Sequence, residues 1–113
     1  MDNCLFCKII KGDIPANKVY ENEHILAFRD IDPKAPVHIL VIPKKHIKSI
    51  NDLESSDKYL AGELILASKK IAKDQGIDSK GFRTIFNTND DGGQTVYHIH
   101  MHIMGGRQMK WPP

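Results

Sequence analysis

The chain has 113 residues, the size of one ordinary domain with a single core. Its formal net charge of +2 offers no basic surface for a nucleic-acid partner, and none is expected. No apolar run approaches the roughly 20 residues that span a bilayer, and the first residues lack the basic and apolar regions of a signal peptide. We therefore expect a cytoplasmic protein with reduced thiols and no membrane partner.

Five strands and two helices are predicted along the chain. Residues 5–11 form a short helix, because Gly12 can end it and Pro15 prevents it from resuming. Residues 37–42 are β-branched and almost continuously apolar, which indicates a strand buried on both faces. The predicted strands are residues 18–21, 25–30, 37–42, 82–88 and 97–104.

One long helix separates the third and fourth predicted strands. Ser55 or Ser56 can cap it, and it runs to about Gln75, with Gly76 as its stop. Its apolar stripe recurs at steps of three and four and consists of Leu60, Leu64, Ala67 and Ile71. Because the connections are of hairpin length, the predicted class is α+β with a mainly antiparallel five-stranded sheet.

The segment from Tyr97 to Met104 alternates three histidines with apolar residues. As a strand it would place His98, His100 and His102 on one face, roughly 6.5–7 Å from neighbour to neighbour. The residues between them would face the core. Such a row suits groups that handle one phosphate, or a metal site completed from elsewhere. It suits packing poorly, because each buried imidazole needs a hydrogen-bond partner.

Cys4 and Cys7 form a C-x-x-C pair near the start of the chain. The pair alone fits a redox motif, half of a zinc site, or two small buried hydrophobic residues. A redox motif is expected between a strand and a helix of a βαβ unit, and no strand precedes this pair. The redox interpretation is therefore the weakest of the three.

Together these motifs resemble the histidine triad (HIT) superfamily, and within it the Hint branch of nucleoside phosphoramidate hydrolases. The family pattern His-x-His-x-His followed by two apolar residues is met over residues 98–104. Asp30-Ile31, His38 in a strand that leads to residues 41–46, and the segment 93–95 agree in the same order. The ending over residues 105–113 is typical of Hint-type proteins. The resemblance implies a single HIT domain over residues 1–113, with a C-terminal tail at 105–113.

The resemblance implies that His100 is the nucleophile. It would attack the α-phosphorus of a nucleotide and form a nucleotidyl-histidine that water then resolves. While one ring nitrogen attacks, the other must donate a hydrogen bond, as to a backbone carbonyl. His102 and His38 would contact phosphate oxygens or hold His100 in place. Thr95 would relay a proton to the departing amine.

The resemblance also implies a nucleotide site around these groups. Asp30 would accept from both ribose hydroxyls, and Asn87, Gly93 and Gln94 would contact the nucleotide beside its phosphate. An apolar slot for the base would consist of Phe6, Ile9, Phe28, Ile31 and Leu40. Apolar contact reads little base identity, so loose specificity is expected. The alternatives are ordinary core for the apolar residues, a hairpin turn for the loop, and a solvated acid for Asp30.

Some HIT relatives bind a structural zinc through a C-x-x-C pair and two histidines. The corresponding residues here are Cys4, Cys7, His46 and His98, a Cys₂His₂ set with tetrahedral potential. The alternative is two free buried thiols. No cofactor is required for the chemistry itself.

The expected activity is hydrolysis of purine nucleoside 5′-phosphoramidates, with an AMP-like nucleotide as ligand. A dinucleoside polyphosphate hydrolase is the alternative within enzymes, and a nucleotidyltransferase is weaker because such relatives carry His-Pro-His in larger chains. A nucleotide-binding or scaffold protein with incidental catalysis is the alternative of another class. The resemblance further implies a homodimer whose sheets join across the two-fold, with each tail near the partner's active site.

Overall fold

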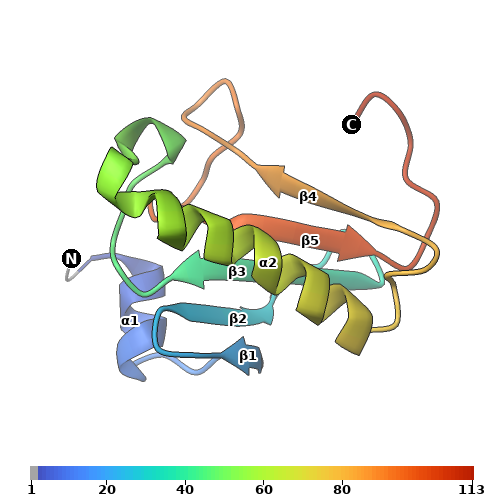
Figure 1. Cartoon of the computed structure of the whole chain (residues 1–113), viewed down its shortest axis with the longest axis horizontal. Helices are drawn as coiled ribbons and strands as arrows, with labels where there is room; N and C mark the ends of the chain where they lie inside the picture. The colour runs from blue at the N-terminus through green and yellow to red at the C-terminus, as the bar shows by residue number, and fades with distance from the viewer. Residues whose placement is uncertain (1–2) are drawn as a thin grey trace.

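The computed structural model describes residues 3–113 and has a five-stranded sheet with two helices (Figure 1). The sheet order is β1-β2-β3-β5-β4, and each neighbouring pair is antiparallel, which confirms the predicted α+β class. The elements are α1 (Leu5–Lys11), β1 (Lys18–Glu21), β2 (Ile25–Arg29), β3 (Val37–Pro43), α2 (Lys58–Asp74), β4 (Phe82–Phe86) and β5 (Met101–Gly105). Two short 3₁₀ turns, Ile50–Asp52 and Ser55–Asp57, precede α2.

The two helices cover opposite faces of the sheet. Figure 1 shows α2 lying across one face, where Leu64, Ala67 and Ile71 pack against apolar residues of β2, β3 and β5. On the other face, Phe6 and Ile9 of α1 pack against the alternate residues of β2 and β3. Central strand β3 is therefore buried on both faces, as its continuous apolar run predicts.

Helix α2 begins two residues later than a Ser55 cap would place it. The chain first makes a 3₁₀ turn, in which the carboxylate of Asp57 accepts the backbone N–H of Glu54 at 2.9 Å. The same carboxylate pairs with the ammonium of Lys45 at 2.6 Å. The predicted cap at Ser55 or Ser56 is therefore wrong: Asp57 precedes α2 without a side-chain cap hydrogen bond, and a capping box between Glu54 and Asp57 closes the turn before it.

Strand β5 is also shorter than predicted, since it begins at Met101 and not at Tyr97. Its ladder with β3 ends at the pair Val41–Met101. Two residues beyond Val41, Pro43 has no N–H to continue a ladder, and the N–H of Ile99 donates instead to Ile47 at 2.6 Å. The first two histidines of the row therefore lie in an extended segment just outside the sheet.

The segment after β5 is held by two arginines. Arg83 of β4 donates to the carbonyl of Lys110 at 2.8 Å, and Arg107 donates to the carbonyl of Lys34 at 3.0 Å. Trp111 is 84% exposed. Among residues 3–113, no helix has both the length and the apolar character needed to cross a membrane.

Candidate active site and metal centre

The imidazoles of five histidines lie close together on the α1 side of the sheet. The ring centroids of His98 and His46 are 5.0 Å apart, those of His100 and His102 are 5.0 Å apart, and His102 lies 5.2 Å from His38. The predicted alternation is present although the first two histidines precede β5, because Met101 and Ile103 pack in the core on the α2 side whereas the rings of His98 and His100 contact Phe6 of α1. The row divides into a metal-type cluster at one end and a catalytic-type cluster at the other.

His100 has its tautomer set by the main chain. Its Nδ1 lies 2.8 Å from the carbonyl oxygen of His98, and a carbonyl can only accept, so Nδ1 carries the proton. Nε2 is therefore the nitrogen with the lone pair. The side chain is buried against the edge of Phe6, and burial lowers the pKa of His100, which keeps the ring neutral near pH 7. A neutral imidazole with a bare Nε2 has the form that a nucleophile requires.

His38 and His102 form a hydrogen-bonded relay whose direction is set by the backbone. The N–H of Lys34 donates to Nδ1 of His38 at 3.0 Å, so the proton of the neutral His38 ring is on Nε2. That Nε2 lies 2.9 Å from Nδ1 of His102 and donates to it. The remaining proton of His102 must then be on Nε2. Burial lowers the pKa of His38, and it lowers that of His102 to about 4, so both rings are neutral at pH 7.

Asp30 lies beside this relay, with its Oδ2 at 3.4 Å from Nε2 of His38. By distance alone, Asp30, His38 and His102 could together hold a metal ion. However, neutral imidazole has only one lone-pair nitrogen, and His38 uses it on the N–H of Lys34. His38 and His102 therefore form a hydrogen-bonded relay with the acceptor Asp30 beside it, and the three side chains are not a set of metal ligands.

A cavity of about 790 Å³ opens beside the catalytic cluster and lies partly under α1. Its size is in the range of small-molecule sites. All five residues predicted for the base slot line it, namely Phe6, Ile9, Phe28, Ile31 and Leu40. Asp30 and Thr95 also line the cavity, and Oδ1 of Asp30 is held by the N–H of Asp32 at 2.8 Å. Phe6, Ile9 and Leu40 are at the same time part of the core on this face.

Gln94 holds together the loop that precedes the histidines. Its side chain is only 6% exposed, and its Oε1 accepts the N–H of Asn89 at 2.9 Å. Its Nε2 donates to the carbonyls of Lys48 and Val96, and its own backbone N–H donates to Asn89. Gln94 therefore shapes the loop, and its predicted contact with a nucleotide stays a prediction.

The rest of the loop is closely wound. The N–H of Gly93 donates to the carbonyl of Asp90, so this group too is engaged within the loop. Nδ2 of Asn87 donates to the carbonyl of Gly92 at 2.7 Å. The loop residue that reaches the cavity is Thr95, whose side chain is exposed and not hydrogen-bonded to any described residue. Phosphate contacts from Asn87 and Gly93 stay predictions.

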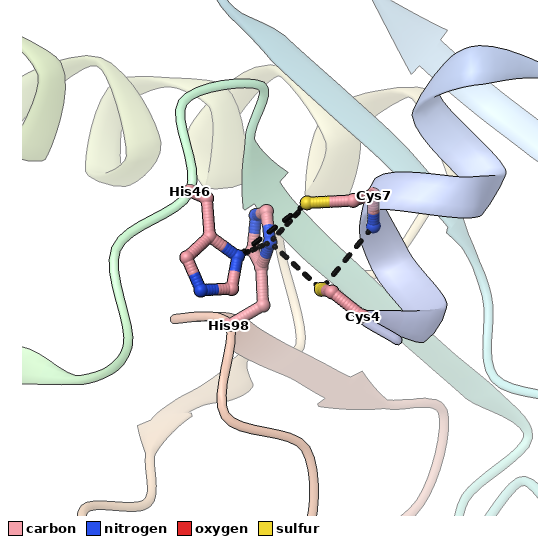
Figure 2. Close-up of side chains that lie close together, drawn as sticks. All are labelled: Cys4, Cys7, His46 and His98. Atoms are coloured by element: carbon pink, nitrogen blue, oxygen red, sulfur yellow. Dashed lines mark hydrogen bonds between the residues drawn. The ribbon is translucent and has the colours of Figure 1, made fainter. Parts of the chain in front are cut away.

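Figure 2 shows the second cluster, in which Cys4 and Cys7 of the α1 end face His46 and His98. Three sulfur–nitrogen distances are 3.4, 3.4 and 3.6 Å, and the two Nδ1 atoms are 3.2 Å apart. A tetrahedral zinc ion, with Zn–S of about 2.3 Å and Zn–N of about 2.05 Å, requires roughly 3.5 Å between sulfur and nitrogen and roughly 3.3 Å between nitrogens. The four side chains therefore fit a zinc ion in both donor type and spacing.

The surroundings of this cluster also prepare it for a cation. Nε2 of His98 donates to the carbonyl of Pro43 at 2.8 Å, which leaves Nδ1 bare and directed at the cysteines. Burial lowers the pKa of His98 to about 4, so the ring stays neutral. The N–H of Cys7 donates to Sγ of Cys4 at 3.3 Å, so the backbone of α1 orients this sulfur.

Comparison with known proteins identifies the family. The model of the HIT domain matches residues 11–109. The chain belongs to the HIT family. It is 49% identical to an uncharacterized HIT-like protein of Synechococcus elongatus, over 99% of this chain and 97% of that protein.

Solved structures of HIT proteins have the same fold. A HIT family hydrolase from Legionella pneumophila is 56% identical, with a TM-score of 0.97 over 98% of this chain and 99% of that one. A histidine triad nucleotide-binding protein from Candida albicans is 32% identical, with a TM-score of 0.83 over 98% of this chain and 84% of that one.

The matched HIT segment contains the relay, His100 and the loop, whereas most of α1 precedes it. Sequence reasoning had placed the histidines but had not found the role of the Lys34 N–H, since a backbone group carries no sequence signal. It also missed several cavity-lining residues. Leu5 and Val96 are two of them, and each adjoins a residue that was predicted, Phe6 and Thr95.

Proposed function

We propose that this HIT protein is a hydrolase of purine nucleoside 5′-phosphoramidates, of the Hint type. The observation that carries the proposal is the pairing of a bare Nε2 on His100 with the relay that leaves a proton on Nε2 of His102, beside a cavity of nucleoside size. The neighbours named HIT family hydrolase and histidine triad nucleotide-binding protein support a nucleotide hydrolase. The tail over residues 105–113 supports the Hint branch in particular.

In the first step, Nε2 of His100 attacks the α-phosphorus, and the phosphorus–nitrogen bond to the amine breaks. The amine leaves with the electron pair and takes up a proton that the hydroxyl of Thr95 relays from solvent. His100 keeps the proton on Nδ1, because the carbonyl of His98 accepts it, so the intermediate is a cationic nucleotidyl-imidazolium. Its positive charge makes the ring a good leaving group.

In the second step, water attacks phosphorus and the bond to His100 breaks, which releases the nucleoside monophosphate and the surplus proton. Through both steps, the N–H of His102 donates to an oxygen of the phosphoryl group, where negative charge grows. The relay through His38 keeps this donor oriented without a change in protonation. The net reaction consumes one water and yields one amine.

The nucleoside is held by the cavity. The carboxylate of Asp30 lines this cavity, and the backbone N–H of Asp32 orients it through Oδ1. In this orientation the carboxylate accepts hydrogen bonds from the ribose hydroxyls. The base lies between the apolar side chains of α1 and those of β2 and β3, with Phe6 and Phe28 edge-on at 5.5 Å. Apolar contacts of this kind select a purine by its size and discriminate little between different purine bases.

We also propose that Cys4, Cys7, His46 and His98 hold a zinc ion. With four protein ligands the site would be closed, so the ion would supply a structural cross-link. It would tie the start of α1 to His98, whose carbonyl orients the nucleophile. The residues of the catalytic cluster carry out the chemistry themselves.

The test is steady-state hydrolysis of adenosine 5′-phosphoramidate and diadenosine tetraphosphate by the wild type and His100→Ala. We expect cleavage of the phosphoramidate, and its loss by at least about a thousandfold in the variant while AMP still binds. Preference for the dinucleotide would assign the protein to the polyphosphate hydrolases. No turnover of either, with AMP bound, would leave a nucleotide-binding or scaffold protein.

We further propose a cytoplasmic homodimer of single-domain chains. Helix α2 exposes Tyr59, Ile65 and Leu66, at 80%, 60% and 67%, and β4 is an edge strand that a second copy can extend. Multi-angle light scattering at micromolar concentration should give twice the chain mass. A monomer mass would refute the dimer without touching the proposed chemistry.

A further inference from the structure

A second cavity, of about 370 Å³, adjoins the nucleoside cavity. The two cavities share three lining residues, Leu5, Thr95 and Val96, and therefore adjoin at these side chains. From there the second cavity extends between the start of α1 and the segment before His98. Its other described lining residues are Asn3, Cys4, His46 and Tyr97. Thr95 is the residue assigned above to protonate the departing amine, and it stands at the junction.

Tyr97 gives this cavity a rigid aromatic wall. The side chain is 41% exposed, yet its hydroxyl donates to Oδ1 of Asp90 at 2.7 Å, which fixes the ring against the loop. Scattered exposed tyrosines are common on protein surfaces. A tyrosine that is exposed, held by its hydroxyl and set in a cavity has the properties of a binding platform. Leu5, at 44% exposed, faces the same cavity.

The charges around this cavity restrict what it can bind. Among the described residues that line it, there is no lysine, arginine, aspartate or glutamate. A chain of bridging phosphates would lie there without a cationic partner, and a charged alkylammonium would lie there without a carboxylate. The carboxylate of Asp90 nearby is already engaged by Tyr97. Asn3 and Thr95 offer only neutral polar groups, and Cys4 and His46 belong to the proposed zinc site.

We propose that this second cavity is the leaving-group subsite, and that it takes the uncharged aromatic or aliphatic arm of the amine that is released. The proposal rests on the proposed phosphoramidate hydrolysis and names the class of substrate. With the nucleoside in the first cavity and phosphorus near His100, the scissile nitrogen lies by Thr95, and an arm attached to it extends along Leu5 toward the face of Tyr97. Amines with a charged arm would gain nothing from this surface.

The test compares three adenosine 5′-phosphoramidates that differ only in the amine: the unsubstituted amidate, the 2-phenylethyl amidate and the amidate of the lysine side chain. Steady-state KM and kcat are measured for the wild type, Tyr97→Ala and Tyr97→Phe. The matched control is Ile50→Ala, which removes an apolar side chain of the same exposure, 42%, that lines neither cavity.

We expect Tyr97→Ala to raise KM for the 2-phenylethyl amidate by roughly 3- to 10-fold, the size of one aromatic contact. Values for the unsubstituted amidate should stay unchanged, and Tyr97→Phe should lie between wild type and Tyr97→Ala. Equal losses on all three substrates would show that Tyr97 only supports the loop, and no loss on any would also overturn the subsite. If the wild type cleaves no amidate, the proposed function fails. The affinity of the intact 2-phenylethyl amidate, measured by calorimetry, then tests the subsite: weaker binding to Tyr97→Ala than to the wild type supports it, and equal binding overturns it.

Discussion

Gly92 should tolerate no side chain, although its backbone conformation is open to any residue. A Cβ built there would lie 2.3 Å from the carbonyl oxygen of Thr88 and 2.7 Å from its nitrogen. Ordinary contact begins near 3.4 Å, so Gly92→Ala requires the two segments of the loop to separate by about 1.1 Å. Both neighbours are backbone atoms, and no side-chain rotation can relieve the clash.

The displacement would reach the active site through the hydrogen bonds of the loop. The carbonyl of Gly92 accepts from Asn87, and the backbone of Gln94 is tied to Asn89, so the loop moves as a unit together with Thr95. Overpacking of this kind costs about 1–3 kcal/mol, or roughly 4–15 °C in Tm for a domain of this size. A shift of about 1 Å beside the reacting atoms can lower kcat/KM on the order of a hundredfold.

The assay combines scanning calorimetry with kcat/KM for the unsubstituted adenosine phosphoramidate. Gly62→Ala is the control, because no atom lies within 4 Å of its added Cβ and the residue is inside helix α2. That variant should gain up to about 1 kcal/mol from helix propensity and keep its activity. If Gly92→Ala matched the wild type in both measurements, the close approach to Thr88 would not be what shapes the loop.

Three further predictions concern the metal, pH and the tail. Metal analysis should find one zinc per chain in the wild type and none in Cys4→Ser/Cys7→Ser, with a lower Tm; chelation that leaves the wild-type Tm unchanged would refute a structural zinc. Burial lowers the pKa of His102 to about 4 from 6.5, so the unfolded chain binds a proton that the folded chain excludes, and stability falls as pH drops through that window. In calorimetry, the stability of His102→Gln should fall less steeply with decreasing pH than that of the wild type. Equal pH dependence of stability in the two proteins would contradict the lowered pKa of His102. Deleting residues 107–113 removes two hydrogen bonds made by arginines. The deletion should change the order of kcat/KM values across the amine series and have little effect on Tm. Unchanged kinetics would show that the tail is outside the site.

Elements defined by local chemistry were predicted well. The short helix α1 has the predicted bounds, because Gly12 adopts a left-handed φ of 86° at its end. Three residues of the predicted stripe of α2 are buried, and the fourth, Leu60, packs partly buried against them. The start of β5 was wrong by four residues, because a strand ends where its partner stops pairing, and Pro43 belongs to a strand far away in sequence.

The sequence by itself identified which histidines, cysteines and apolar residues to consider, since alternation and motif spacing are properties of neighbouring residues. Only the tertiary structure decided which nitrogen of each imidazole carries the proton. The N–H of Lys34 and the carbonyls of Pro43 and His98 make that choice, and backbone groups have no side-chain identity to read. Folding likewise brings one ligand atom of each of Cys4, Cys7, His46 and His98 to within 4.8 Å of the others, because hydrogen-bonded strands and a packed helix place distant segments side by side.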